Sequence, residues 1–490
     1  MPGRSRRRWL GLALAVATTG WVLWALPFVF FDPVPIAVSV VGAQGETIDG
    51  VRFLIDGEAV DGRPGATTKI MWDRRPIVLR AEADGYQPHE KRVDEQPVGP
   101  IELVLIPTRL RGLIRDQQGN PVGGALVEAP PGSAIAGPDG SFEVLKAGIG
   151  PVVISKPAWK PAAREWSGEG DMNVTIEPLV IRAIHLHGGI PEQETGWDKF
   201  IELASTTELN GLMLDLKDET GTVFYDSKVE VANEIGAVTG SFRLADVVAA
   251  AEEADLYLIG RIVVFQDPIA AHNARDMAVW DTARDGPYGK SGHWFLDPTD
   301  PAARQYGLDL AEEACLAGFD EIQFDYVRFP DGLPQSIRFD EVLSPQVRVA
   351  AIGQFLSEAR SKLNSEGCAV AADIFGFIAT ATDDGGIGQQ WEAITQVVDV
   401  ASPMLYPSHY GPGWFGLDDP TDDPRTVVSE ALDDGLGRMA GPAIVRPWLQ
   451  DFGYDEDQVR AQIDEADERG LGWMLWNFSS EFTTSALDPG

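Results

Sequence analysis

The sequence predicts an α/β protein built around a (β/α)8 barrel, or TIM barrel, preceded by two small β-sandwich domains and a transmembrane helix. Three observations support this class. At the usual 100 to 200 residues per domain, 490 residues correspond to roughly three domains. Residues 36–180 alternate short β-branched segments with turn residues. Residues 181–490 repeat a strand-like segment followed by an amphipathic helical one.

Residues 1–35 are expected to form a basic cytoplasmic tip and a membrane anchor. Four arginines within residues 4–8 precede the uncharged stretch 9–31, which is about 34 Å long as a helix and so long enough to cross a bilayer. Cleavage of a signal peptide after residues 15–17 is the alternative, although it would leave a very apolar new terminus and a secreted protein. Since the arginines stay inside, the following domains are expected outside the cytoplasmic membrane.

Two β-sandwiches are expected next, over residues 36–107 and 108–180. Segments such as IAVSVVG and IELVLIP, separated by Gly, Asp and Pro, define the first. The second contains the turn sequences Gly119-Asn120-Pro121 and Pro138-Asp139-Gly140 between its strands. This pattern resembles the carboxypeptidase regulatory-like β-sandwich, a spacer or attachment module of extracytoplasmic proteins.

Residues 181–490 are expected to form the barrel. Helix-like runs such as FRLADVVAAAEEA place apolar residues at i, i+3 and i+4. They separate strand-like segments at 181–187, 211–217, 256–265, 321–329, 369–376, 400–406, 443–450 and 472–478. An open, doubly wound sheet is the alternative, but the Gly-rich phosphate loop that usually follows its first strand is missing from the sequence.

Charge and cysteine content exclude two further classes. The chain has 39 basic and 75 acidic residues and a formal net charge of −36. This charge excludes nucleic acid as a partner, because it would repel the phosphate backbone, and it indicates a solubilising acidic surface. Cys315 and Cys368 lie in apolar segments and are expected to be free thiols in the core rather than a disulfide or redox pair.

The expected catalytic residues are Asp325 and Asp373, at the ends of the fourth and fifth strand-like segments. Functional groups of a TIM barrel lie at the C-terminal ends of its strands, and an unpaired carboxylate inside an apolar strand is costly. Two carboxyl groups can divide the work of glycoside hydrolysis. Asp325 is expected to be the nucleophile or electrostatic partner, kept ionised by Arg328, and Asp373 the acid/base, with a raised pKa.

Other strand ends supply the expected substrate-binding residues. Asp215 and Lys217 are two residues apart on one strand and are expected to form an ion pair, with Asp215 as the reserve catalytic carboxylate. The neighbouring Asp218 and Glu219 are interpreted as loop acids. Aromatic rings stack on sugar rings and polar groups bind hydroxyls, so the expected substrate-binding residues are Asp215, Lys217, Arg328, Tyr406, His409, Trp448 and Trp476.

Several long motifs in this region resemble a known family. They are LDLKDETG (214–221), GRIVVFQDP (260–268), GFDEIQFDYVRFPDG (318–332), ADIFG (372–376) and SPMLYPSHYGPG (402–413). In this order they are similar to a bacterial family of glycoside hydrolase-like domains, barrels related to amylase-type and chitinase-type hydrolases, over about 182–480. The resemblance implies a glycosidase that hydrolyses O-glycosyl bonds of an extracytoplasmic polysaccharide or oligosaccharide without a cofactor.

The sequence is compatible with two other functions, a polysaccharide-binding barrel and a metal-dependent hydrolase. A barrel whose groove binds polysaccharide but no longer hydrolyses it would be a polysaccharide-binding protein. His185 and His187 form an H-x-H pair at the end of the first strand, which could converge on a metal ion in a metal-dependent hydrolase. Such a site needs further ligands on later strands, and the fourth, fifth and eighth strand-like segments contain no histidine. No metal is therefore expected.

The charge asymmetry of the N-terminus makes a topological prediction. A protease added to intact cells should digest the barrel, because the arginines hold residues 1–8 in the cytoplasm and leave the chain after residue 31 outside. Immunoblotting with a cytoplasmic marker as control measures this. Protection of the barrel until the cells are lysed would contradict the predicted orientation.

Overall fold

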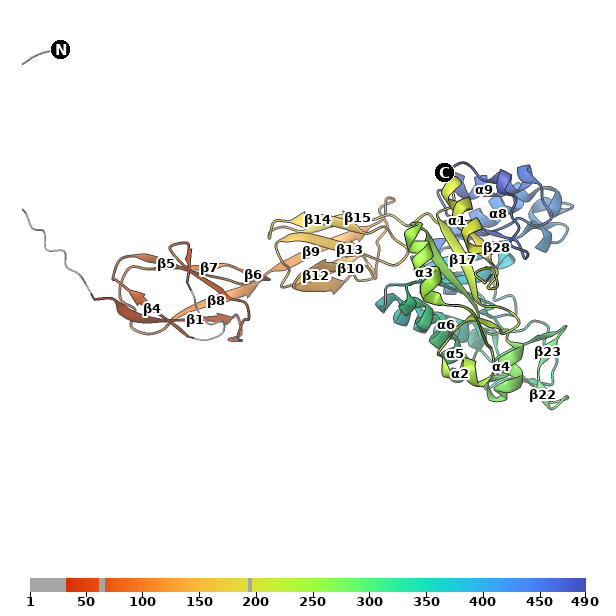
Figure 1. Ribbon diagram of the computed structural model, residues 1–490, viewed down its shortest axis with the longest axis horizontal. Coiled ribbons are helices and arrows are strands. Elements are labelled where there is room, and N and C mark those ends of the chain that lie inside the picture. The colour runs from red at the N-terminus through yellow and green to blue at the C-terminus, as the bar shows by residue number, and fades with distance from the viewer. Residues whose placement is uncertain (1–31, 61–66, 193–195) are drawn as a thin grey trace, which may run out of the picture. The chain divides into compact units, whose positions relative to one another are not determined.

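The computed structural model describes residues 32–60, 67–192 and 196–490 (Figure 1). The chain divides into two compact units, Met1–Pro107 and Thr108–Gly490. The expected membrane anchor at 9–31 lies outside the described residues. Among the helices that are described, none combines the length and the apolar character needed to cross a membrane.

The described part of the first unit is a β-sandwich. One sheet has the strand order β4-β1-β8-β6 and the other β3-β2-β5-β7. Buried residues from both sheets alternate with exposed ones and share one core, as expected when each sheet buries one face. The strands are β1 (Val34–Gly42), β2 (Arg52–Ile55), β3 (Glu58–Ala59), β4 (Thr68–Trp72), β5 (Ile77–Glu82), β6 (Tyr86–Gln87), β7 (His89–Val93) and β8 (Ile101–Pro107).

A second β domain begins the second unit. Its sheets have the orders β11-β10-β13-β14 and β12-β9-β15. The strands are β9 (Arg109–Arg115), β10 (Leu126–Ala129), β11 (Gly132–Ile135), β12 (Ser141–Leu145), β13 (Gly150–Ser155), β14 (Ala162–Trp166) and β15 (Met172–Thr175).

This second β domain packs on the barrel at the N-terminal ends of the barrel strands. Its apolar core is continuous with Ala369, Ala371 and Val400 at the beginning of two barrel strands. Next to them, the buried ammonium of Lys156 lies 3.4 Å from the buried carboxylate of Asp399. The domain therefore closes the N-terminal end of the barrel and leaves the C-terminal end open.

The barrel itself consists of eight parallel strands and closes where β16 pairs with β17. Each of the eight predicted segments contains one of them. They are β16 (Arg182–Leu186), β17 (Gly211–Lys217), β20 (Tyr257–Val263), β25 (Glu321–Asp325), β27 (Ala369–Phe375), β28 (Val400–Leu405), β30 (Trp448–Gln450) and β31 (Trp473–Trp476). The segment 443–450 also contains β29 (Ile444–Val445), separated from β30 by Pro447, which has no N–H to donate.

Helices follow the strands, as the apolar spacing predicted. The helix at Pro301–Ala317 has typical capping residues at both ends. At its N-terminus the side chain of Asp300 accepts a hydrogen bond from Ala302 N, and at its C-terminus Gly318 adopts the left-handed conformation. The helices are α1 (Gly196–Thr206), α2 (Glu230–Glu234), α3 (Leu244–Glu253), α4 (Pro268–Asn273), α5 (Pro301–Ala317), α6 (Pro345–Ser365), α7 (Trp391–Val397), α8 (Pro424–Gly437) and α9 (Glu456–Glu468).

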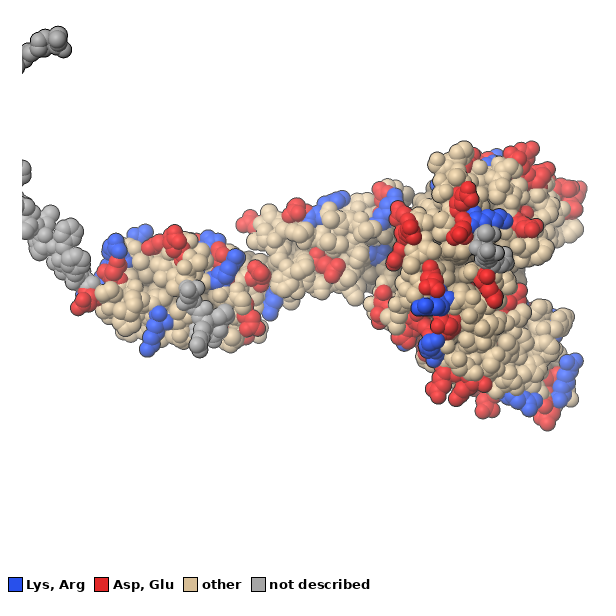
Figure 2. Space-filling model, in the orientation of Figure 1, with Lys and Arg blue, Asp and Glu red and all other residues tan. Residues whose placement is uncertain are grey.

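The loops at the open end of the barrel contain short strands. β18 (Val223–Tyr225) and β19 (Val238–Phe242) extend the barrel sheet beyond β17. The others are β21 (Trp280–Asp281), β22 (Gly286–Pro287), β23 (Gly289–Lys290), β24 (His293–Trp294) and β26 (Ile337–Arg338). Figure 2 shows acidic side chains spread over the visible face of the barrel rather than gathered in one patch, as a solubilising surface requires.

The expectation of free cysteines is wrong. Cys315 near the end of α5 and Cys368 just before β27 form a disulfide, with Cα atoms 5.9 Å apart. Each cysteine is buried, as its apolar surroundings predicted. The local sequence could not show that the barrel brings a helix end and a strand start, 53 residues apart, into contact.

This disulfide makes a stability prediction. Replacing both cysteines (Cys315→Ser with Cys368→Ser) should lower the free energy of unfolding by about 4 kcal/mol, because the bridge constrains a long loop of the unfolded chain. Denaturant unfolding with and without reductant measures this. Wild type should lose the same stability in reductant, while the double variant should not respond; equal stability of both proteins without reductant would contradict the bridge.

Candidate active site

A cavity of about 530 Å³ opens at the C-terminal ends of the barrel strands. This is the end at which TIM-barrel enzymes carry their active sites. Its wall combines two carboxylates, one arginine and many aromatic rings: Glu219, Arg261, Asp325, Tyr326, Phe375, Gly376, Phe377, Met404, Tyr406, His409, Tyr410, Trp448 and Trp476. The sequence predicted five of them as site residues, namely Asp325, Tyr406, His409, Trp448 and Trp476.

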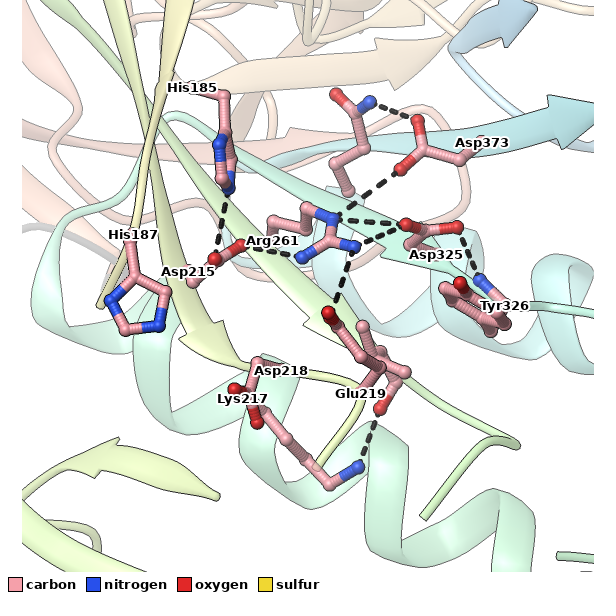
Figure 3. Close-up of polar contacts among 12 residues, drawn as sticks. His185, His187, Asp215, Lys217, Asp218, Glu219, Arg261, Asp325, Tyr326 and Asp373 are labelled. Atoms are coloured by element: carbon pink, nitrogen blue, oxygen red, sulfur yellow. Dashed lines mark hydrogen bonds and ion pairs between the residues drawn. The ribbon is translucent and has the colours of Figure 1, made fainter. Parts of the chain in front are cut away.

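Arg261 on β20 organises the acidic groups of the site (Figure 3). Its Nη1 donates to Asp215 Oδ1 at 2.6 Å, and its Nη2 and Nε donate to Asp325 Oδ2 at 2.5 and 3.0 Å. Only 2% of its side chain is exposed. Burial alone would lower the pKa of Arg261, but the carboxylates of Asp215 and Asp325 raise it well above its usual value. Arg261 is therefore a permanent cation.

Asp325 is the last residue of β25, and its carboxylate reaches the cavity with 8% of the side chain exposed. The strand ends there because Tyr326 has a φ of 48°. This left-handed conformation is unusual for a bulky residue and costs about 1–3 kcal/mol. It brings the backbone N–H of Tyr326 within 2.5 Å of Asp325 Oδ1. One carboxylate oxygen is thus held by Arg261 and the other by the backbone.

Asp373 on β27 lies beneath the cavity wall rather than on it. Its side chain is 1% exposed, and its Oδ2 lies 4.0 Å from Arg261 Nε. Oδ1 accepts hydrogen bonds from Gln323 Nε2 and, at 2.5 Å, from Trp448 Nε1. Burial and the nearby charge of Asp325 raise the pKa of Asp373 well above its usual value. These surroundings favour the protonated, neutral form of Asp373.

Asp215 lies behind Arg261 and does not pair with Lys217 as expected. Its Oδ2 lies 2.9 Å from His185 Nε2. Burial would raise the pKa of Asp215, but His185 and Arg261 together lower it below its usual range. Lys217 instead lies 2.9 Å from Asp267 Oδ2. The expectation of a shared face is wrong because a β-bulge between Asp215 and Lys217 breaks the alternation of β17.

Arg328 is not the ion-pair partner of Asp325, and this expectation is also wrong. The guanidinium of Arg328 lies over the rings of Tyr326 and Phe375, 5.3 and 5.0 Å from their centres, and donates to the carbonyl of Phe329. Burial lowers its pKa. The left-handed turn at Tyr326 directs the chain away from the strand, so the predicted strand over 321–329 ends early and Arg328 supports two aromatic residues of the cavity wall.

The predicted aromatic residues meet at the cavity. Trp448 and Trp476 pack edge to face with ring centres 5.5 Å apart, and Arg261 lies over the Trp476 ring at 5.2 Å. Tyr406 and His409 form a second edge-to-face pair at 5.2 Å. Burial lowers the pKa of His409, which favours a neutral ring. These rings give the cavity apolar faces of the kind on which sugar rings stack.

The sequence interpretation missed Arg261 and Glu219. Both lie within motifs that were recognised, GRIVVFQDP and LDLKDETG. An arginine inside the apolar strand LYLIGRIVVF was a signal of a buried ion pair. Nothing local distinguishes Glu219 from the neighbouring loop acid Asp218, because only the folded turn shows which of them faces the cavity.

The two histidines of the H-x-H pair have different partners. His185 contacts Asp215, whereas His187 Nδ1 accepts a hydrogen bond from Gly189 N, and its ring packs on Phe224. Across the residues that the structure describes, no three His, Cys, Asp or Glu side chains are grouped to hold a metal ion. The pair does not form the converging set that a metal-dependent hydrolase requires.

A family model described as "Putative glycosyl hydrolase domain" matches residues 183–482. This range contains all the cavity residues and more than half of the chain. The chain therefore belongs to this family of glycosyl hydrolase-like domains. A comparison with curated protein sequences finds no match.

Three solved structures from bacteria are similar to part of this chain. A hypothetical protein from Ruminiclostridium thermocellum is 31% identical, covering 39% of this chain and 96% of its own, with a TM-score of 0.36. The PgaB (BpsB) glycoside hydrolase domain from Bordetella bronchiseptica is 14% identical over 62% and 95%, with a TM-score of 0.46. The PelA glycoside hydrolase domain from Pseudomonas aeruginosa is 10% identical over 62% and 96%, with a TM-score of 0.37.

The Arg261 network makes a stability prediction. Arg261→Met should lower the free energy of unfolding by about 3–5 kcal/mol, because it leaves buried carboxylates unpaired. Urea unfolding measures this, with Arg284→Met, whose arginine is 73% exposed, as the control.

The pH dependence provides the second part of this test. The pKa of Asp215 is lowered in the folded protein, so its contribution is present above the unfolded value of about 3.9 and is lost as the pH falls below it. The difference between wild type and Arg261→Met should therefore shrink in acid. Equal effects of the two substitutions at neutral pH would contradict the role given to Arg261.

Proposed function

We propose that this protein is a glycosidase that hydrolyses O-glycosyl bonds of an extracytoplasmic polysaccharide or oligosaccharide. The observation that carries the proposal is the carboxylate of Asp325, fixed by Arg261 on the wall of a cavity lined with aromatic rings. Membership of the glycosyl hydrolase-like family supports the same reaction class.

The arrangement suits the chemistry of glycoside hydrolysis. Cleavage passes through a state in which positive charge develops on the sugar ring, and a fixed carboxylate next to the anomeric carbon stabilises that charge or forms a bond to the carbon. Arg261 and the Tyr326 N–H use both oxygens of Asp325 without blocking the cavity, since carboxylate oxygens have several lone pairs. In this proposal Asp325 is the catalytic residue and Arg261 a positioning residue.

Asp373 has a supporting role in this proposal. Burial and the charge of Asp325 raise its pKa, which favours the neutral form. Its hydrogen bonds from Gln323 and Trp448 hold it below the wall, where it limits the negative charge around Asp325.

We also propose that the barrel works outside the cytoplasmic membrane, anchored through residues 9–31. The Cys315–Cys368 disulfide supports this location, because disulfides persist mainly in oxidising compartments. In the same proposal residues 108–180 are a carboxypeptidase regulatory-like module. Its packing against the closed end of the barrel supports a structural role and leaves the cavity accessible to a polymer.

Substitution of Asp325 tests the proposed function. The full chain is assayed for release of reducing ends from a panel of bacterial cell-surface and environmental polysaccharides. Asp325→Asn should reduce turnover at least about 100-fold, because the neutral amide cannot stabilise or attack the anomeric carbon. Glu366→Gln, at an exposed residue after α6, is the control.

Three outcomes are decisive. Loss of turnover in Asp325→Asn with full activity of the control supports a glycosidase. Near wild-type turnover of Asp325→Asn contradicts the site. Binding of a polysaccharide by wild type without any turnover on the panel identifies a polysaccharide-binding barrel instead.

A further inference from the structure

Glu219 is presented to the cavity by a rigid turn. It lies between β17 and the antiparallel β18, and the preceding Asp218 fixes the turn by accepting from the backbone N–H groups of Thr220 and Thr222. Gly221 has a φ of +83°, and a Cβ there would meet the carboxylate of Asp267. The side chain of Glu219 itself is 45% exposed and points toward Arg261 (Figure 3). The turn thus places the Glu219 carboxylate at the cavity, within ion-pair distance of Arg261.

Glu219 and Asp325 face the cavity at close range. Among the described residues they are the acidic ones that line it. Asp325 Oδ2 lies 2.5 Å and Glu219 Oε2 3.9 Å from the same atom, Arg261 Nη2. The two oxygens are separated by at most the sum of these distances. This limit for one pair of oxygens includes the approximately 5 to 5.5 Å that separates the carboxyl groups of retaining glycosidases.

Asp373 does not meet the same requirements. An acid/base must touch the glycosidic oxygen and then a water molecule, so its carboxyl group has to reach the cavity. The side chain of Asp373 is 1% exposed, and two donors already hold its Oδ1. The side chain of Glu219 is 45% exposed, so its carboxyl group can reach a bound substrate.

We propose that Glu219 is the acid/base that acts with Asp325, and that the protein cleaves its substrate with retention of anomeric configuration. This inference rests on the proposed glycosidase function, which it deepens by assigning the second carboxyl group and the stereochemistry.

The reaction then proceeds in two displacements. The carboxyl group of Glu219 donates its proton to the glycosidic oxygen while the bond from that oxygen to the anomeric carbon breaks and Asp325 forms an ester with the carbon. The leaving sugar departs with the proton. The Glu219 carboxylate next takes a proton from water as the water oxygen attacks the anomeric carbon and the ester to Asp325 breaks. One water is consumed, and two inversions give net retention.

Glu219→Gln tests the assignment on the panel polysaccharide that the wild-type full chain cleaves. It should reduce kcat by at least about 100-fold, and azide should restore turnover on 2,4-dinitrophenyl glycosides, whose leaving group needs no proton. Proton NMR of the first product should show the anomer of the substrate. Glu366→Gln is the matched control, a glutamate that is exposed and lies at the opposite end of the barrel.

The outcomes separate this inference from the proposed function. No turnover by wild type refutes the proposed function, and the role of Glu219 with it. Turnover by wild type that Glu219→Gln retains, or a first product of inverted configuration, overturns only the inference. Loss of turnover in Asp373→Asn with full activity in Glu219→Gln assigns the acid to Asp373 instead.

A labelling experiment tests the geometry without a substrate. Carbodiimide with glycine ethyl ester converts accessible carboxyl groups to amides, which peptide mass spectrometry locates. Glu219 should be labelled and Asp373 should not. Labelling of Asp373 while Glu219 stays unmodified would overturn the inference.

Discussion

The ion pairs of one buried guanidinium hold the whole site together. Arg261 binds Asp215 with one Nη atom and Asp325 with Nε and the other Nη, and it lies between Glu219 and Asp373. Without this cation several carboxyl groups would face one another in a low-dielectric interior, where unpaired charges are costly. The planar fork of arginine suits this task, because it can bind two carboxylates in fixed directions.

The fold provides the rigid frame that such a network requires. Arg261, Asp325 and Asp373 come from the neighbouring strands β20, β25 and β27, whose parallel pairing fixes their relative heights. The second β domain packs on the opposite end of the barrel, where its core includes Ala369 and Ala371 of β27. Beside the catalytic carboxylate, the backbone is strained at the left-handed Tyr326, which directs its N–H to Asp325. Stability at one end of the barrel thus supports a strained site at the other.

The sequence predicted the secondary-structure elements well, but it did not predict which distant residues contact one another. Strand-and-helix periodicity predicted all eight barrel strands, and strand ends predicted five residues of the cavity wall. Pairings between distant segments were not predicted: Cys315 with Cys368, Arg261 with Asp325, and Lys217 with Asp267. Local irregularities caused the remaining errors, because a bulge separates Asp215 from Lys217 and a left-handed residue separates Asp325 from Arg328.

In the proposed reaction Asp325 attacks the anomeric carbon, with Glu219 as its acid/base. The most direct measurement is mass spectrometry of the Glu219→Gln protein incubated with an activated glycosyl fluoride of the sugar that wild type releases. The second displacement is slow without the base, so a glycosyl ester should accumulate on the peptide that contains Asp325. An ester on another residue, or release of inverted product with no covalent adduct, would contradict the account.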